Sequence, residues 1–127
     1  MVTMKTRGFT VIELLVVLAA IALLLSIAAP RYLQHLDTAR EVALRQDLRE
    51  MRDAIDKFHA DQSRYPQTLD ELVKRRYLRS VPADPLTDRS DTWVLVAPPE
   101  GKAGGAVYDV HSGAPGQARD GSPYASW

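Results

Sequence analysis

Glu13 is the residue whose chemistry stands out, because it is an acidic side chain inside an apolar run. The run extends from Phe9 to Ala29, and only Thr10, Glu13 and Ser26 interrupt it. A carboxylate near the centre of a lipid-exposed helix costs about 2.5–3.5 kcal/mol on insertion scales, and somewhat less toward the interface. Either Glu13 is a charge that snorkels to the membrane surface or becomes protonated, or a partner compensates for it.

The other reactive side chains show no catalytic pattern. The histidines are scattered, at His35, His59 and His111. Their spacing fits neither a metal site nor a catalytic triad. Asp84, Asp88 and Asp91 lack the glycine and the terminal glutamate of an EF-hand, so we expect a solvated loop there. The sequence therefore predicts that the protein is not an enzyme.

Composition excludes several classes of protein. The chain has 127 residues, which leaves room for one small domain beside the apolar segment. Lys and Arg together number 16, as do Asp and Glu, so no basic excess is present to bind nucleic acid. The absence of cysteine rules out disulfides, thiolate metal sites and a cysteine nucleophile.

The apolar run has the length of a membrane span. Its roughly 21 residues are enough to cross a bilayer as a helix. Lys5 and Arg7 precede it, which predicts a cytoplasmic N-terminus and a C-terminal part on the far side. A cleaved signal peptide shares these ingredients, but its apolar core has only about 7–15 residues, and cleavage after Ala29 would place Pro30 at the scissile bond. We therefore expect residues 9–29 to form a retained transmembrane helix.

After Pro30 the pattern continues as an amphipathic helix. Apolar residues recur mostly at steps of three and four, at Tyr32, Leu33, Leu36, Ala39, Val42, Ala43, Leu48, Met51, Ile55 and Phe58. Pro30 removes one backbone hydrogen bond and is a candidate position for a kink. We expect one helix from about Phe9 to about Asp61, with residues 30–62 as its amphipathic continuation.

The remaining residues, 63–127, predict a small head that covers this stripe. Residues 68–73 are typical of a short helix with a capping box between Thr68 and Glu71. Residues 92–96 and 106–111 are rich in β-branched and aromatic residues and predict a two-stranded antiparallel hairpin. The tail, residues 112–127, is rich in Gly, Ser and Pro and predicts a loop anchored by its aromatic side chains. The expected fold class is α+β, with a small head on a long N-terminal helix.

Residues 8–15, Gly-Phe-Thr-Val-Ile-Glu-Leu-Leu, resemble the prepilin peptidase recognition sequence of type IV pilins and type II secretion pseudopilins. The shared features are a basic leader that ends in Gly, cleavage before Phe, and Glu at the fifth position of the mature chain. Later segments are similar to the major, G-type pseudopilin, at residues 64–66, 69–72, 77–78, 81–85 and 108–113. The resemblance implies a type IV pilin-like fold.

The resemblance also implies how such a chain is processed and what it does. Residues 1–8 would be the leader, with cleavage between Gly8 and Phe9 and N-methylation of Phe9 by prepilin peptidase. The mature chain would sit in the bacterial inner membrane with a periplasmic head. It would polymerise through its N-terminal helix, with other pseudopilins and an inner-membrane platform, into a type II secretion pseudopilus that drives protein export. Glu13 would then pair with the Phe9 amine of a neighbouring subunit and set the register of assembly.

A calcium site is common in the C-terminal loop of the G-type family, and Ser112 and Asp120 are its candidate ligands here. Calcium takes about 6–8 oxygens, usually with several carboxylates. This chain has Ala114-Pro115-Gly116 where the family tends to have an acidic residue, so a capping Ser112 and a turn at Asp120-Gly121 form the alternative. The expectation is that no cofactor is required, with calcium as an open possibility.

Two other functions share these features. The first is a subunit of a type IV pilus or a DNA-uptake system, although pilins often carry a disulfide loop that this cysteine-free chain cannot form. The second is a membrane-anchored periplasmic binding module whose start merely resembles a prepilin. The sequence names neither the secreted cargo nor the start codon, since Met4 could initiate as well as Met1.

Overall fold

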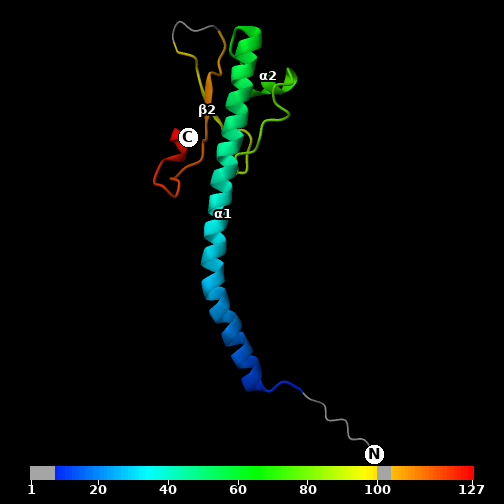
Figure 1. Cartoon of the computed structure of the whole chain (residues 1–127), viewed down its shortest axis with the longest axis vertical. Helices are drawn as coiled ribbons and strands as arrows, with labels where there is room; N and C mark the ends of the chain where they lie inside the picture. The colour runs from blue at the N-terminus through cyan, green and yellow to red at the C-terminus, as the bar shows by residue number, and fades with distance from the viewer. Residues whose placement is uncertain (1–7, 100–103) are drawn as a thin grey trace, which may run out of the picture. The chain divides into compact units, whose positions relative to one another are not determined.

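The computed structural model describes residues 8–99 and 104–127. The chain divides into two compact units, Met1–Asp37 and Thr38–Trp127, and the helix α1, Val11–Gln62, contributes to both. This helix confirms the predicted one, since its ends lie within two residues of those expected (Figure 1). Residues 1–7 of the predicted leader lie outside the described residues.

In the first unit, α1 is an uncovered apolar helix. It has the length and composition of a membrane span. Its large apolar side chains are exposed, among them Leu14, Val16, Leu18, Ile21, Leu24 and Ile27. The helix continues through Pro30, although a proline has no N–H to donate to the carbonyl four residues earlier. Surface of this kind requires lipid or other helices to cover it.

In the second unit, one stripe of α1 forms the core. The buried positions follow one another at steps of three and four residues, as Leu44, Leu48, Met51, Ala54, Ile55 and Phe58. They pack with buried side chains from the rest of the head, namely Tyr65, Leu69, Leu72, Trp93, Val107 and Val110. The stripe is covered from Leu44 onward, whereas most of its predicted earlier members are exposed, namely Tyr32, Leu33, Ala39, Val42 and Ala43. The predicted stripe is therefore longer than the part that residues 63–127 cover.

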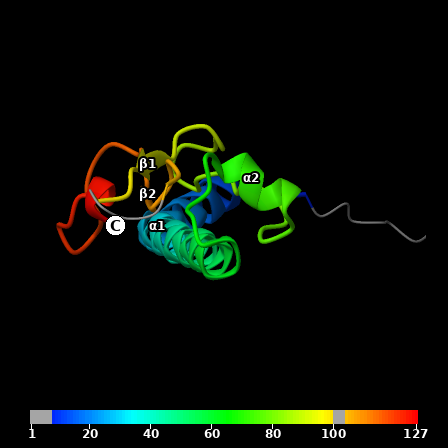
Figure 2. The ribbon, with the colours of Figure 1, turned by 90° about the horizontal axis from the view of Figure 1, so that it is seen from above.

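The head contains the expected hairpin, with strands shorter than predicted. β1, Val94–Val96, pairs with β2, Asp109–His111, in antiparallel register, with Leu95 opposite Val110. Figures 1 and 2 show the strands between α2 and the C-terminal residues. Trp93, just before β1, is buried and donates its indole N–H to the carbonyl of Pro82 over 2.8 Å. Of the connection between the strands, residues 100–103 lie outside the described part of the chain.

The second helix, α2, is Leu69–Lys74, and half of its predicted capping box is wrong. Thr68 caps the helix as expected, because its hydroxyl accepts the Glu71 N–H over 3.2 Å. The Glu71 carboxylate does not return to Thr68. It accepts the Gln67 N–H over 2.8 Å and the Arg64 guanidinium over 2.5 Å. Arg64, two residues after the end of α1, binds Glu71 in place of Thr68 and so links the ends of the two helices.

Residues 112–127, called the C-terminal segment below, form the predicted loop with one turn of 3-10 helix, η1, Tyr124–Ser126. The expected aromatic anchors are present, since Tyr124 and Trp127 pack against the core with ring centroids 5.2 Å apart. Gly113 at the start of the segment is sterically required, because a Cβ there would lie 1.9 Å from the carbonyl oxygen of Thr92. The start of the C-terminal segment therefore packs closely against the backbone that leads into β1.

Two hydrogen bonds hold the pKa of the Glu71 carboxyl below its ordinary value of 4.5. The bond from Arg64 has the larger effect, and the bond from the Gln67 N–H has the smaller one. Because the folded carboxyl has the lower pKa, its contribution to stability is complete above the unfolded pKa and is lost as pH falls through the folded one. We expect Glu71→Gln to lower the free energy of unfolding at neutral pH and to have little effect at strongly acidic pH. Urea unfolding of the full chain in detergent, followed by tryptophan fluorescence across this pH range, measures the difference.

The matched control is Asp70→Asn, which removes a charge from the same helical turn at an exposed position. A Glu71→Gln effect that equals the Asp70→Asn effect at every pH would show that the Arg64 bond contributes nothing.

Candidate functional site

The junction between Gly8 and Phe9 lies outside α1 and is open to solvent. Residues 8–10 are not helical, and the Phe9 side chain is 88% exposed. No atom beyond the chain neighbours lies within 4 Å of the position that a Cβ on Gly8 would take. The structure thus leaves the predicted cleavage bond outside the helix and exposed to solvent.

Glu13 lies in the first turn of α1 and forms a capping box with Thr10. The Thr10 hydroxyl accepts the Glu13 N–H over 3.2 Å, and the Glu13 carboxylate accepts the Thr10 N–H over a long 3.4 Å. The positive end of the helix dipole also favours a negative charge here. This bond was not predicted from the sequence, although the Thr-x-x-Glu spacing is the same one that predicted the cap of the second helix.

Ser112 is buried and bound to another buried side chain, Asp84. The Ser112 hydroxyl donates to Asp84 Oδ2 over 2.6 Å and accepts the Ala114 N–H over 3.1 Å. The other Asp84 oxygen accepts the Leu86 N–H over 2.8 Å. The expectation of a solvated loop is therefore wrong at Asp84, while Asp88 and Asp91 are exposed as expected. Asp84 thus links the loop that contains it to the start of the C-terminal segment by a hydrogen bond.

Asp120 lies in an exposed turn, as the alternative to a calcium ligand predicted. Its Oδ1 accepts from both the N–H and the hydroxyl of Ser122, over 2.9 and 2.5 Å. These bonds, the hydroxyl's first, hold the pKa of Asp120 below its usual value, and the nearby Arg45 adds to the effect. Asp120 Oδ2 lies 4.0 Å from the Arg45 guanidinium.

Ser112 and Asp120, the predicted calcium ligands, are each bound to other side chains in the structure. The Ser112 oxygen faces Asp84, and Asp120 is engaged by Ser122 and Arg45. Burial, followed by the charges of Glu50 and Asp84, raises the pKa of the Asp47 carboxyl. Even so, within residues 8–99 and 104–127 no group of three or more acidic or histidine side chains is arranged to hold a metal ion.

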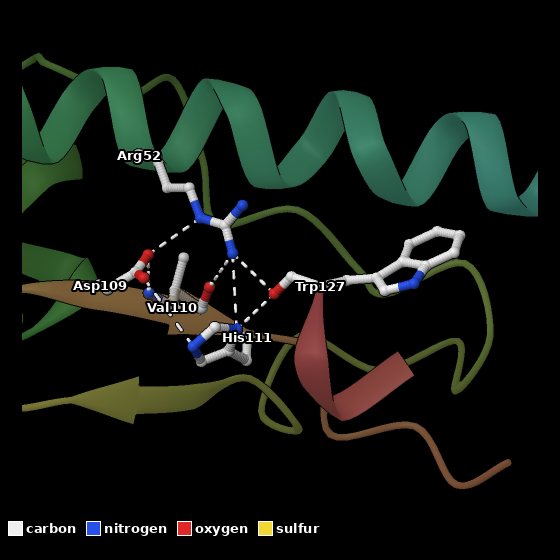
Figure 3. Close-up of polar contacts among 5 residues, drawn as sticks. All are labelled: Arg52, Asp109, Val110, His111 and Trp127. Carbon is white, nitrogen blue, oxygen red and sulfur yellow. Dashed lines mark hydrogen bonds and ion pairs between the residues drawn. The ribbon is translucent and has the colours of Figure 1, made fainter. Parts of the chain in front are cut away.

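The densest polar cluster in the head forms around Arg52 of α1 (Figure 3). Its guanidinium donates to Asp109 Oδ1 over 2.9 Å, to the Val110 carbonyl over 2.8 Å and to the Trp127 main-chain oxygen over 2.7 Å. His111 Nδ1 also contacts that Trp127 oxygen. No local pattern in the sequence indicates this cluster, because its members lie up to 75 residues apart.

Known proteins match this chain both at the start of its long helix and over most of its length. The profile of the prokaryotic N-terminal methylation motif matches residues 3–29. The type II secretion system core protein G of Escherichia coli (strain K12) is 31% identical over 129 aligned residues, which cover 89% of this chain and 84% of that protein. The chain belongs to this family. It is therefore a pseudopilin of the G type, as the resemblance of the later segments, residues 64–66, 69–72, 77–78, 81–85 and 108–113, implied.

Other members of the core protein G family match over shorter spans. The core protein G of Pseudomonas aeruginosa is 29% identical over 97 residues, covering 64% of this pseudopilin and 68% of that protein. The core protein G of Klebsiella michiganensis is 30% identical over 95 residues, covering 62% and 67%. No solved structure matches significantly.

The bond between Ser112 and Asp84 predicts a structural role for Ser112 in this pseudopilin. Ser112→Ala would leave a buried carboxylate oxygen without its donor, which costs about 1–3 kcal/mol of the free energy of unfolding. Urea unfolding of the full chain in detergent measures the loss. Ser90→Ala, at an exposed position in the same loop region, is the control. Equal stabilities for the two variants would contradict the role.

Proposed function

We propose that this pseudopilin is a structural subunit that is cleaved between Gly8 and Phe9 by prepilin peptidase, methylated at the Phe9 amine, and polymerised through α1. The match of residues 3–29 to the methylation motif carries the proposal. The accessible junction at Gly8 supports cleavage, and the uncovered apolar half of α1 supports polymerisation. In the resulting type II secretion pseudopilus, the subunit would help to drive proteins across the outer membrane.

The apolar half of α1 anchors the chain in the inner membrane. We propose that residues 9–29 span it, with residues 1–8 in the cytoplasm and the head, residues 63–127, in the periplasm. Lys5 and Arg7 support this orientation, since positive residues next to a span stay on the cytoplasmic side. Other pseudopilins and an inner-membrane platform are the proposed partners in assembly.

Glu13 is the proposed register residue of that assembly. Cleavage would give Phe9 a positively charged amine, and a neighbour displaced along the filament could offer its amine to Glu13. The single long bond to Thr10 leaves the Glu13 carboxylate with unused acceptor capacity, and its side chain is exposed. Among apolar helices, a slipped register would leave both charges unpaired, which is strongly unfavourable.

A type IV pilus or DNA-uptake subunit is not favoured, because the relatives that match over most of their length are core proteins of type II secretion systems. The family is structural, and we propose that the chain acts through assembly and not through catalysis.

Processing is tested directly by incubating the full chain in detergent with active prepilin peptidase. We expect mass spectrometry to show loss of residues 1–8 and, with the methyl donor present, a methylated N-terminal Phe9. Gly8→Val is the matched control and should remain uncut, because a branched side chain at the scissile position prevents close approach of the enzyme. An intact N-terminus on the wild-type chain would refute the proposed function.

The register role is tested with Glu13→Gln, which keeps the shape of the side chain and removes its charge. We expect normal insertion and cleavage but filament yield lowered more than about tenfold, since an unpaired charge among apolar helices costs several kcal/mol. Electron microscopy of filaments produced in cells measures the yield. Thr10→Val is the control, because it removes the capping hydroxyl and keeps the carboxylate. Normal filaments from Glu13→Gln, or an equal loss with Thr10→Val, would contradict the pairing.

A further inference from the structure

We infer that Arg52 holds the C-terminal segment on the head in the way that a bound calcium ion would, so that the fold of this pseudopilin is independent of calcium. This property belongs to the isolated subunit and does not depend on the proposed assembly. Three oxygens converge on the Arg52 guanidinium.

Arg52 joins parts of the chain that are far apart in sequence. From α1 it reaches Asp109 and Val110 of β2 and, beyond them, the main-chain oxygen of Trp127, all within 2.9 Å (Figure 3). A guanidinium has five donors in a fixed plane, so one side chain can hold several oxygens at set angles. The Arg52 and Asp109 side chains are 36% and 32% exposed, so the pair is partly shielded from water. The arrangement is a cation with a shell of oxygens from two segments.

Two further residues of α1 hold the same segment. Glu41 accepts the Arg119 N–H over 2.9 Å and the Tyr124 hydroxyl over 3.1 Å. The Arg45 guanidinium lies 4.1 Å from the centre of the Trp127 indole ring. Positions 41, 45 and 52 are spaced by four and seven residues, which places them on one face of the helix. This face meets the C-terminal segment along its length.

The charge of this face opposes a metal ion. Arg45, Arg49 and Arg52 line one cavity of about 300 Å³ with Leu48, Ser126 and Trp127. Of the acidic residues in the segment from Tyr108 to Trp127, Asp109 is bound to Arg52 and Asp120 lies near Arg45. Calcium needs about 6–8 oxygens, usually with several carboxylates. Arginines already lie beside both acidic residues that the C-terminal part of the head could offer to such a shell.

Calcium-independence is tested on the purified full chain in detergent, by circular dichroism during heating with millimolar calcium or with a chelator. We expect the two Tm values to agree within about 1 °C, because an ion that does not bind the folded state cannot stabilise it. An ion present at about 100 times its Kd would raise Tm by several degrees. A rise of that size would overturn the inference, whichever residues supplied the ligands.

The role of Arg52 is tested with Arg52→Gln. We expect Tm to fall by about 5–10 °C, in the presence of calcium as much as in its absence. Hydrogen exchange followed by mass spectrometry should show faster exchange in residues 112–127 and at the end of β2. Arg40→Gln is the matched control, since Arg40 is an exposed arginine of the same helix that does not line this cavity. Equal behaviour of the two variants, or rescue of Arg52→Gln by calcium, would overturn the inference.

Should Arg52→Gln fail to fold, Asp109→Asn serves in its place. It removes the negative charge that faces the guanidinium and leaves the bonds to Val110 and Trp127. We expect a smaller fall in Tm and the same faster exchange in the C-terminal segment, whereas exchange that matches the wild type would overturn the inference. A failure of filament assembly would leave all of these measurements unaffected, because they are made on single subunits.

Discussion

The head depends on the burial of a single stripe of α1, from Leu44 to Phe58. A hairpin with strands of three residues is marginal by itself in water, and a helix of six residues is no more stable. Both persist because Leu72, Val107 and Val110 pack against that stripe. The long helix is thus the surface on which the rest of the unit packs, and the described residues of the head form no core that is independent of it.

The same part of α1 also binds the C-terminal segment through an adjacent face. There the contacts are polar, with Glu41, Arg45 and Arg52 meeting the C-terminal segment. Apolar burial selects which face of the helix lies inside, while these bonds fix where an otherwise irregular segment rests. Asp84 and Ser112 complete the attachment at the segment's start, with both side chains fully buried. A loop rich in Gly and Pro is held by directed bonds, not by its own secondary structure.

The sequence predicted the features that arise from local patterns. The length of α1, its buried stripe, the Thr68 cap and the antiparallel hairpin follow from periodicity and from residue preference. The burial of Asp84 and the Arg52 cluster could not be predicted, because their partners lie 28 to 75 residues away and carry no local signal. The bond between Thr10 and Glu13 could have been found, since its spacing is that of a capping box. Among the expected site residues, Gly8 and Phe9 lie at an exposed junction, whereas Ser112 and Asp120 lie on different partners.

In the assembly proposed for this pseudopilin, the bond between Thr10 and Glu13 would change what a subunit brings to a growing filament. A bare carboxylate would have to lose its water before it moved among apolar helices, and that loss would slow each addition. In the structure one oxygen already has a donor from the backbone of the same chain, and the helix end supplies further positive potential. Addition of a subunit would then exchange one hydrogen-bond donor for a stronger, charged one. The capping bond would thereby lower the kinetic barrier to growth, although the finished filament would not need it.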